Sequence, residues 1–117
     1  MARLAAADIA LDTFPYGSHT NAADALWAGV PLVTAYGDTF ASRVGASMLA
    51  TAGLAEWSFD EPRKALDFVA SLTRDAAKLA AAKEKARAAR GSALFDAPAF
   101  ARDFERLLLA AAGREAP

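Results

Sequence analysis

The sequence predicts an α/β fold built around a small parallel sheet. Two segments contain apolar runs with the length and composition of strands, residues 8–13 around Ile9-Ala10-Leu11 and residues 30–35, and the first run suits a strand covered on both faces. Each run is followed, after a short link, by a segment with helical spacing of apolar residues, 20–28 and 40–53. Strands and helices that alternate in this way are typical of a parallel α/β unit, in which ligands bind at the carboxyl ends of the strands. We expect both loops that follow the predicted strands to lie at that edge.

Composition agrees with one domain and disfavours several classes of function. The 117 residues are 55% hydrophobic and 23% charged, although alanine makes up much of the hydrophobic count. A net charge of −1 gives no general attraction to nucleic acid or anionic lipid. The absence of cysteine excludes disulfides and thiol chemistry, and a single histidine disfavours a histidine-based metal site. Without an evident membrane span or signal peptide, we expect a cytoplasmic location, no metal, no membrane partner and no nucleic-acid partner.

The first half of the chain predicts a strand, a helix and a second strand. Because Met1 lies so close to the first strand, nothing precedes it to build an earlier part of the sheet, and we expect a fragment of a larger protein. The helix from Thr20 to Ala28 should end at Gly29 and Pro31. Its sheet-facing side is made of small or apolar residues, namely Ala22, Ala25, Leu26 and Gly29.

The middle of the chain continues the same alternation. Asp38 or Thr39 is suited to cap the helix that begins at Phe40 and ends at Gly53. Residues 54–59 predict a third short strand with Trp57 and Phe59 on one face.

Helices are predicted for most of the remaining chain. Asp60 and Pro62 start a helix that runs to about Leu72. Residues 73–90 have strong helix propensity, and their basic side chains surround the helix, which favours a solvated helix over a nucleic-acid surface. The last helix follows the break at 91–92, and we expect an apolar stripe of that helix to be buried: Phe100, Phe104, Leu107, Leu108 and Ala111.

The stretch from Leu11 to Gly29 carries the most chemical information. It predicts a strand, a tight loop and the start of a helix, with Ser18, His19, Thr20 and Asn21 at the junction. The first N–H groups of a helix have no internal partners and carry the positive end of its dipole, so they can bind an anion such as phosphate. One turn further on, Asp24 can accept hydrogen bonds from ribose hydroxyls. Together these features indicate a nucleotide.

A purely structural interpretation of the same residues stays open at this point. Ser18, Thr20 and Asn21 are ordinary N-capping residues. A lone His19 is more often a structural hydrogen-bonding residue than a ligand-binding one, although its ring nitrogens suit it to donate to a phosphate oxygen. Asp24 can simply be a favourable charge near the start of a helix.

A longer pattern favours the nucleotide interpretation. After the His-Thr pair, the chain reads Leu-Trp-Ala-Gly at 26–29, Pro-Leu-Val-Thr at 31–34, Gly-Asp-Thr at 37–39 and Ala-Ser-Arg-Val at 41–44. With this spacing the sequence resembles the O-linked N-acetylglucosamine transferases, SPINDLY-like and bacterial members included. The resemblance is dense over Leu11 to Leu54 and faint to about Leu109.

The resemblance implies a fold and an activity. The fold would be a partial Rossmann-like parallel sheet from the second lobe of a GT-B glycosyltransferase, with residues 1–59 as the α/β nucleotide-binding part and 60–112 as a helical extension. Such enzymes transfer N-acetylglucosamine from UDP-N-acetylglucosamine to serine or threonine hydroxyls of proteins, with inversion and without a required metal or other cofactor. A non-catalytic nucleotide-binding module and a purely structural α/β domain exposed by truncation are the alternatives.

The resemblance also assigns residues. His19 and Thr20 match the pair that contacts the diphosphate, and Asp24 matches the carboxylate at the ribose. Asn21 stands where the animal enzymes have a second threonine, and Gly17-Ser18 replaces their Asn-Gly, so a contact there is expected from the backbone. A structural role is expected for Ser18 and for Arg43, whose guanidinium would join the second helix to the loop before it by paired hydrogen bonds.

The chain lacks other parts of such an enzyme. No residue in it is expected to be catalytic, and the first lobe, the acceptor site and any tetratricopeptide repeats for the protein acceptor lie outside it. We therefore expect the 117-residue chain to be inactive alone. We also expect it to self-associate through an unpaired sheet edge and the apolar last helix.

Overall fold

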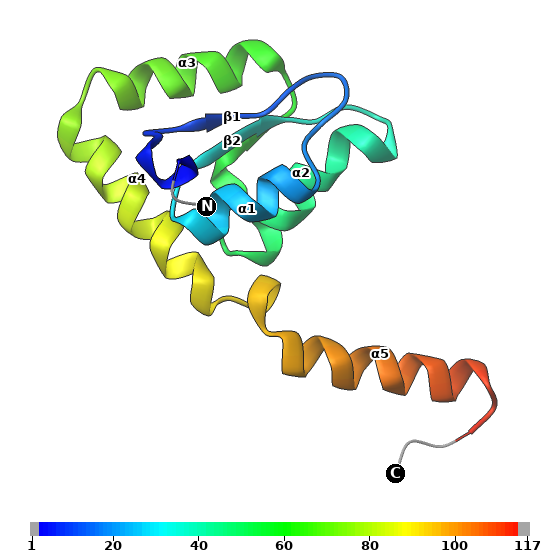
Figure 1. The fold of residues 1–117 in the computed structure, drawn as a ribbon. Coiled ribbons are helices and arrows are strands. Elements are labelled where there is room, and N and C mark those ends of the chain that lie inside the picture. Colours follow the sequence, from blue (N-terminus) through cyan, green and yellow to red (C-terminus); the bar gives the residue numbers. More distant parts are fainter. Residues whose placement is uncertain (1–2, 115–117) are drawn as a thin grey trace.

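A three-stranded parallel sheet with helices on both faces forms the body of the molecule (Figure 1). The computed structural model describes residues 3–114. The strands are adjacent in the order in which they occur in the chain, β1 (Ala10–Leu11), β2 (Leu32–Ala35) and β3 (Ser58–Phe59). The prediction of an α/β fold with a parallel sheet is confirmed.

Five α-helices occur within residues 3–114, namely α1 (Thr20–Ala28), α2 (Phe40–Thr51), α3 (Pro62–Thr73), α4 (Ala76–Ala88) and α5 (Ala97–Ala111). Short 3₁₀ helices lie between the longer elements at Leu4–Ala6, Ala55–Trp57, Ala89–Gly91 and Ala93–Phe95. The predicted limits of the first two α-helices agree with the structure to within two residues. No helix in this described part of the chain has the length and hydrophobicity needed to cross a membrane.

The two faces of the sheet are covered by different helices. On one face, Leu32 of β2 packs with Leu26 of α1 and Leu49 of α2. On the other face, Val33 and Ala35 pack against α3. Because side chains alternate along a strand, β2 is buried on both sides.

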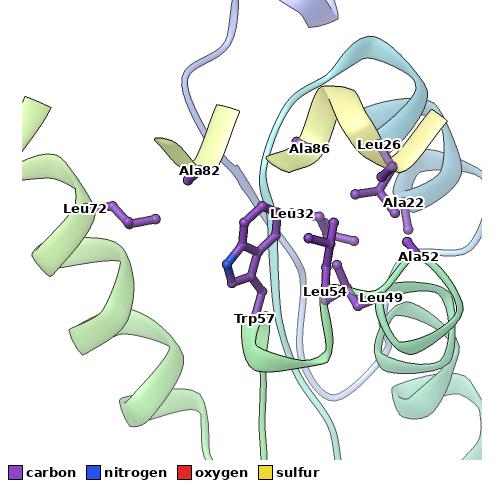
Figure 2. Packing of buried hydrophobic residues seen from close by; sticks show 11 residues of the cluster. Ala22, Leu26, Leu32, Leu49, Ala52, Leu54, Trp57, Leu72, Ala82 and Ala86 are labelled. Carbon is purple, nitrogen blue, oxygen red and sulfur yellow. The ribbon is translucent and has the colours of Figure 1, made fainter. Parts of the chain in front are cut away.

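Alanines bring α4 close to the larger of the two clusters (Figure 2). Ala82 and Ala86 of α4 face Leu26, Trp57 and Leu72, which come from three other elements. Both α3 and α4 therefore belong to the same packed body as the strands, and the helix that stands apart from it is α5 (Figure 1).

The first strand is shorter and more exposed than expected. Only Ala10 and Leu11 form strand, paired with Leu32 and Val33, and β1 lies at the edge of the sheet. Leu11 is 52% exposed, so the expectation that this strand is covered on both faces was wrong. An edge strand has a neighbour on one side only, and within the described residues β1 has β2 alone.

Trp57 and Phe59 do not share a face, contrary to expectation. Trp57 ends a 3₁₀ helix and is buried in the cluster that contains Leu72. Phe59 lies in β3 and packs with Val33 in the other cluster. The alternation expected for one continuous strand fails because the strand begins only at Ser58.

The apolar stripe of α5 is exposed rather than buried. Phe100 and Phe104 stack on each other with ring centres 5.9 Å apart, yet they are 69% and 52% exposed. The helix extends away from the body (Figure 1), so its apolar residues contact no core. The helical spacing is confirmed, and within residues 3–114 nothing buries the stripe, so its burial against a further surface stays a prediction.

Candidate functional site: the pocket at the start of α1

A polar pocket of about 380 Å³ lies where the loop after β1 enters α1. It is lined by residues from the loop and the first turn of the helix, Thr13, Tyr16, Gly17, Ser18, His19, Thr20 and Asn21. The loop after β1 contacts the first turn of α2 here, because Gly17 N–H donates to the Ala41 carbonyl at 3.0 Å. Four of the residues predicted for the site, 18–21, are therefore brought together at the carboxyl edge of the sheet.

His19 is the residue that precedes the first turn of α1. Its carbonyl accepts hydrogen bonds from the N–H groups of Ala22 and Ala23, while its side chain makes no capping bond. The Nε2 atom is buried and has no hydrogen-bond partner among residues 3–114. A buried ring nitrogen normally has a partner, so this atom is suited to bind a ligand.

Two aromatic rings hold the imidazole of His19. Tyr16 stacks on it with ring centres 5.4 Å apart, and Phe40 meets it edge-on at 6.2 Å. Both rings are open to solvent, with Tyr16 66% and Phe40 80% exposed. Sequence interpretation assigns neither ring to the site, because a single aromatic in a loop (Tyr16) or at the first position of a helix (Phe40) gives no pattern.

The start of α1 has free backbone donors. The N–H groups of Thr20 and Asn21 have no acceptor within the described part of the chain, and no side chain caps this end of the helix. Side-chain capping, the structural interpretation that was open for Ser18, Thr20 and Asn21, is not used here. Unpaired N–H groups at the positive end of a helix are suited to an anion.

Asp24 lies one turn further along α1 and does not line the pocket. It is half-buried and has no hydrogen bond or ion pair with any residue from 3 to 114. Because residues three apart are neighbours on a helix surface, its carboxylate lies on the side of α1 that Asn21 also occupies. The carboxylate is available to accept hydrogen bonds from a ligand that extends beyond the pocket.

Arg43 joins α2 to the loop before it. Its Nε donates a 2.7 Å hydrogen bond to the Gly37 carbonyl, and its Nη2 lies 3.8 Å from Asp38. This is one hydrogen bond and a longer ion contact, where paired hydrogen bonds were expected. The helix itself is capped by Thr39, whose hydroxyl accepts from Ser42 N–H.

Asp12 is a residue of the site that sequence interpretation missed. Its carboxylate accepts hydrogen bonds from the Ser18 N–H at 2.6 Å and from the Thr34 hydroxyl at 2.7 Å. An acidic residue between an apolar run and a loop with proline and glycine was the available signal, because aspartate commonly bonds to nearby backbone N–H groups in such turns.

The described residues contain no cluster of side chains suited to bind a metal ion. Among residues 3–114, no three histidine, cysteine or acidic side chains lie close enough to hold an ion together. The expectation that no metal is required stays a prediction.

Comparisons with known proteins identify relatives of this chain among glycosyltransferases. The chain is 37% identical over 103 residues to the UDP-N-acetylglucosamine–peptide N-acetylglucosaminyltransferase of Caenorhabditis elegans, covering 87% of this chain and 9% of that protein. It is 51% identical over 47 residues to the probable transferase SPINDLY of Solanum lycopersicum, covering 40% of this chain and 5% of that one. It thus spans less than a tenth of the length of these relatives.

A solved structure extends the likeness to three dimensions. An O-GlcNAc transferase mutant of Thermobaculum terrenum superposes with a TM-score of 0.82 at 35% identity, over 92% of this chain and 21% of that one. The model of glycosyl transferase family 41 matches residues 1–104. The chain therefore belongs to glycosyl transferase family 41.

Proposed function

We propose that this chain is the nucleotide-sugar-binding part of a protein O-GlcNAc transferase. It would belong to the second, Rossmann-like lobe of a GT-B enzyme that transfers N-acetylglucosamine from UDP-N-acetylglucosamine to serine or threonine, with inversion and without a metal, in the cytoplasm. Membership of family 41 and the names of the relatives support the reaction class.

The observation that carries the proposal is the buried Nε2 of His19 beside the N–H groups of Thr20 and Asn21, all three without a hydrogen-bond partner in residues 3–114. These are all donors when the imidazole carries its proton on Nε2, so they suit the oxygens of a diphosphate. Asp24, one turn further along the same helix, is then suited to accept hydrogen bonds from the ribose hydroxyls. Protein acceptors would be bound by regions outside these residues.

A transfer assay on the intact protein that carries this chain tests the proposal. We expect N-acetylglucosamine to move from UDP-N-acetylglucosamine to a peptide hydroxyl, and we expect the isolated 117-residue chain to be inactive, because a GT-B site lies between two lobes. Tight UDP binding without transfer by the intact protein would favour a non-catalytic nucleotide-binding module. Absence of UDP binding would contradict both.

A further inference from the structure

The carboxylate of Asp12 fastens both ends of the pocket loop. Oδ1 accepts hydrogen bonds from the N–H of Thr13 at 2.8 Å and of Ser18 at 2.6 Å. Oδ2 accepts from the hydroxyl of Thr34, a fully buried residue of β2, at 2.7 Å. One side chain therefore ties the loop from 13 to 18 to the centre of the sheet.

Helix α2 leaves room for this carboxylate at Gly45. A Cβ atom built on Gly45 would lie 2.7 Å from Oδ2 of Asp12 and 3.3 Å from Oγ1 of Thr34. The first distance is far below van der Waals contact, so any larger residue at 45 must displace Asp12, Thr34 or the helix. Elements β1, β2 and α2 thus meet around one carboxylate.

The groups around Asp12 suit a hydrogen-bond acceptor. All three groups that face it are donors, two backbone N–H groups and one hydroxyl, and an ionised carboxylate accepts without donating. Hydrogen bonds to an ionised acceptor are also stronger than neutral ones. Asparagine would keep one oxygen for the two N–H groups but would turn an NH₂ group toward Thr34.

This arrangement determines which donors remain for a ligand. The Ser18 N–H is already bound to Asp12, whereas those of Thr20 and Asn21 are free within residues 3–114. Asp12 itself does not line the pocket. We infer that Asp12 is a positioning residue, which, with Gly45 making room for it, holds the loop so that the free N–H groups and the His19 ring converge on the anion. The inference rests on the proposed nucleotide site.

The test compares UDP with uridine, because a change in loop position affects phosphate contacts but not contacts to the nucleoside. Dissociation constants are measured by calorimetry on the intact protein for the wild type, Asp12→Ala, Asp12→Asn and Gly45→Ala. Gly91→Ala is the matched control, because a Cβ there meets nothing within 4 Å. Circular dichroism establishes that each variant is folded.

We expect Asp12→Ala to weaken UDP binding roughly tenfold or more, and uridine binding less than about twofold, since it removes charge-assisted hydrogen bonds that orient the phosphate donors. Asp12→Asn should lose less UDP affinity than Asp12→Ala. Gly45→Ala should lower the UDP-to-uridine preference as well, although residue 45 lies outside the pocket, while Gly91→Ala should leave it unchanged.

The outcomes separate this inference from the function on which it rests. A wild-type protein that binds UDP no better than uridine would contradict the proposed diphosphate site. A wild type that prefers UDP, together with folded Asp12→Ala and Gly45→Ala variants that keep the same preference, would overturn the positioning role alone. If Asp12→Ala does not fold, Gly45→Ala decides.

Discussion

Arg90 holds the C-terminal end of α1 through Trp27. Its Nε donates a 2.6 Å hydrogen bond to the Trp27 carbonyl, and its guanidinium lies 5.8 Å from the centre of the Trp27 ring. The same ring meets Phe95 edge-on at 5.2 Å. A cation near the last carbonyls of a helix also interacts favourably with the helix dipole. The helix whose first turn forms the pocket is thus fixed at its other end by residues more than 60 positions away in the sequence.

Arg90→Ala should lower the free energy of unfolding of the chain by about 1 kcal/mol. It removes an exposed hydrogen bond to a carbonyl and a cation–π contact, both of modest size at the surface. Urea denaturation followed by circular dichroism measures the change. Arg102→Ala is the control, because Arg102 makes no ion pair or hydrogen bond with another residue between 3 and 114. Equal losses for the two variants would contradict the role of Arg90.

Gly29→Ala should destabilise the chain more than Gly53→Ala. Both glycines end a helix in the same way, with φ of +76° and +75°, so both substitutions carry the left-handed backbone penalty of about 1–2 kcal/mol. A Cβ at Gly29 would also lie 2.7 Å from Cγ of Arg87, whereas one at Gly53 meets nothing within 4 Å. Thermal unfolding of both variants measures the difference.

Adding Arg87→Ala separates the two contributions. In the Arg87→Ala background the close contact is absent, so only the backbone penalty remains. Gly29→Ala should then lower the free energy of unfolding, relative to Arg87→Ala alone, by about as much as Gly53→Ala lowers it relative to the wild type. Equal losses of unfolding free energy in the Gly29→Ala and Gly53→Ala single variants would show that the Arg87 side chain moves aside without a measurable penalty.

The loss of UDP affinity on alanine substitution should differ among the site residues, according to which ligand contacts alanine keeps at each position. Asp24→Ala removes a charged acceptor and should weaken UDP binding by roughly 1.5–3 kcal/mol in the intact protein. Asn21→Ala keeps the backbone N–H and loses a side chain with no hydrogen bond among residues 3–114, so its cost should be within about 0.5 kcal/mol. His19→Ala should weaken UDP binding more than uridine binding.

Calorimetric titrations with UDP and uridine decide this order. If His19 only supports the fold, His19→Ala will lower the melting temperature and leave the ratio of UDP to uridine affinity unchanged. Unchanged UDP binding in Asp24→Ala would show that the ribose carboxylate has been assigned to the wrong residue.

We also expect the 117-residue chain to self-associate through α5. Phe100, Phe104, Leu107 and Leu108 are each more than half exposed on this one helix, and a contiguous apolar surface of this kind favours association. Light scattering should show oligomers that become monomers in the Phe100→Ser, Phe104→Ser double variant. Leu66→Ser, which removes one exposed apolar residue from α3, is the control and should not alter the mass. A clean monomer of the unaltered chain at high concentration would contradict the expectation.

Local signals in the sequence were sufficient for α1 and α2. Each helix is followed by a glycine with a left-handed backbone, Gly29 or Gly53, a conformation that favours glycine. The Thr39 side chain caps the start of α2. Such signals act within a few residues, so they can be recognised without a structure. The same holds for β2, whose continuous apolar run reflects burial on both faces.

Features that depend on distant residues could not be predicted. The exposure of Leu11 depends on which strands neighbour β1, and that of Phe100 on whether anything lies against α5. The role of Asp12 depends on Thr34, 22 residues away, and on Gly45, 33 residues away, which the sequence does not place beside it. Residues 18–21 of the pocket could be grouped because they are consecutive, whereas the contact of Phe40 with His19 exists only through the fold.

The isolation of α5 has a consequence for amide hydrogen exchange. None of its residues belongs to either core cluster of the described part of the chain, so its backbone hydrogen bonds can open without disturbing those clusters. The hydrogen-bonded amides of α1 and β2, by contrast, should exchange only when the buried contacts of Leu26, Leu32 and Val33 are broken. Deuterium uptake along the chain should therefore rise sharply after Phe95, the last residue that packs against the core cluster, and the position of that step marks where the cooperatively folded unit ends.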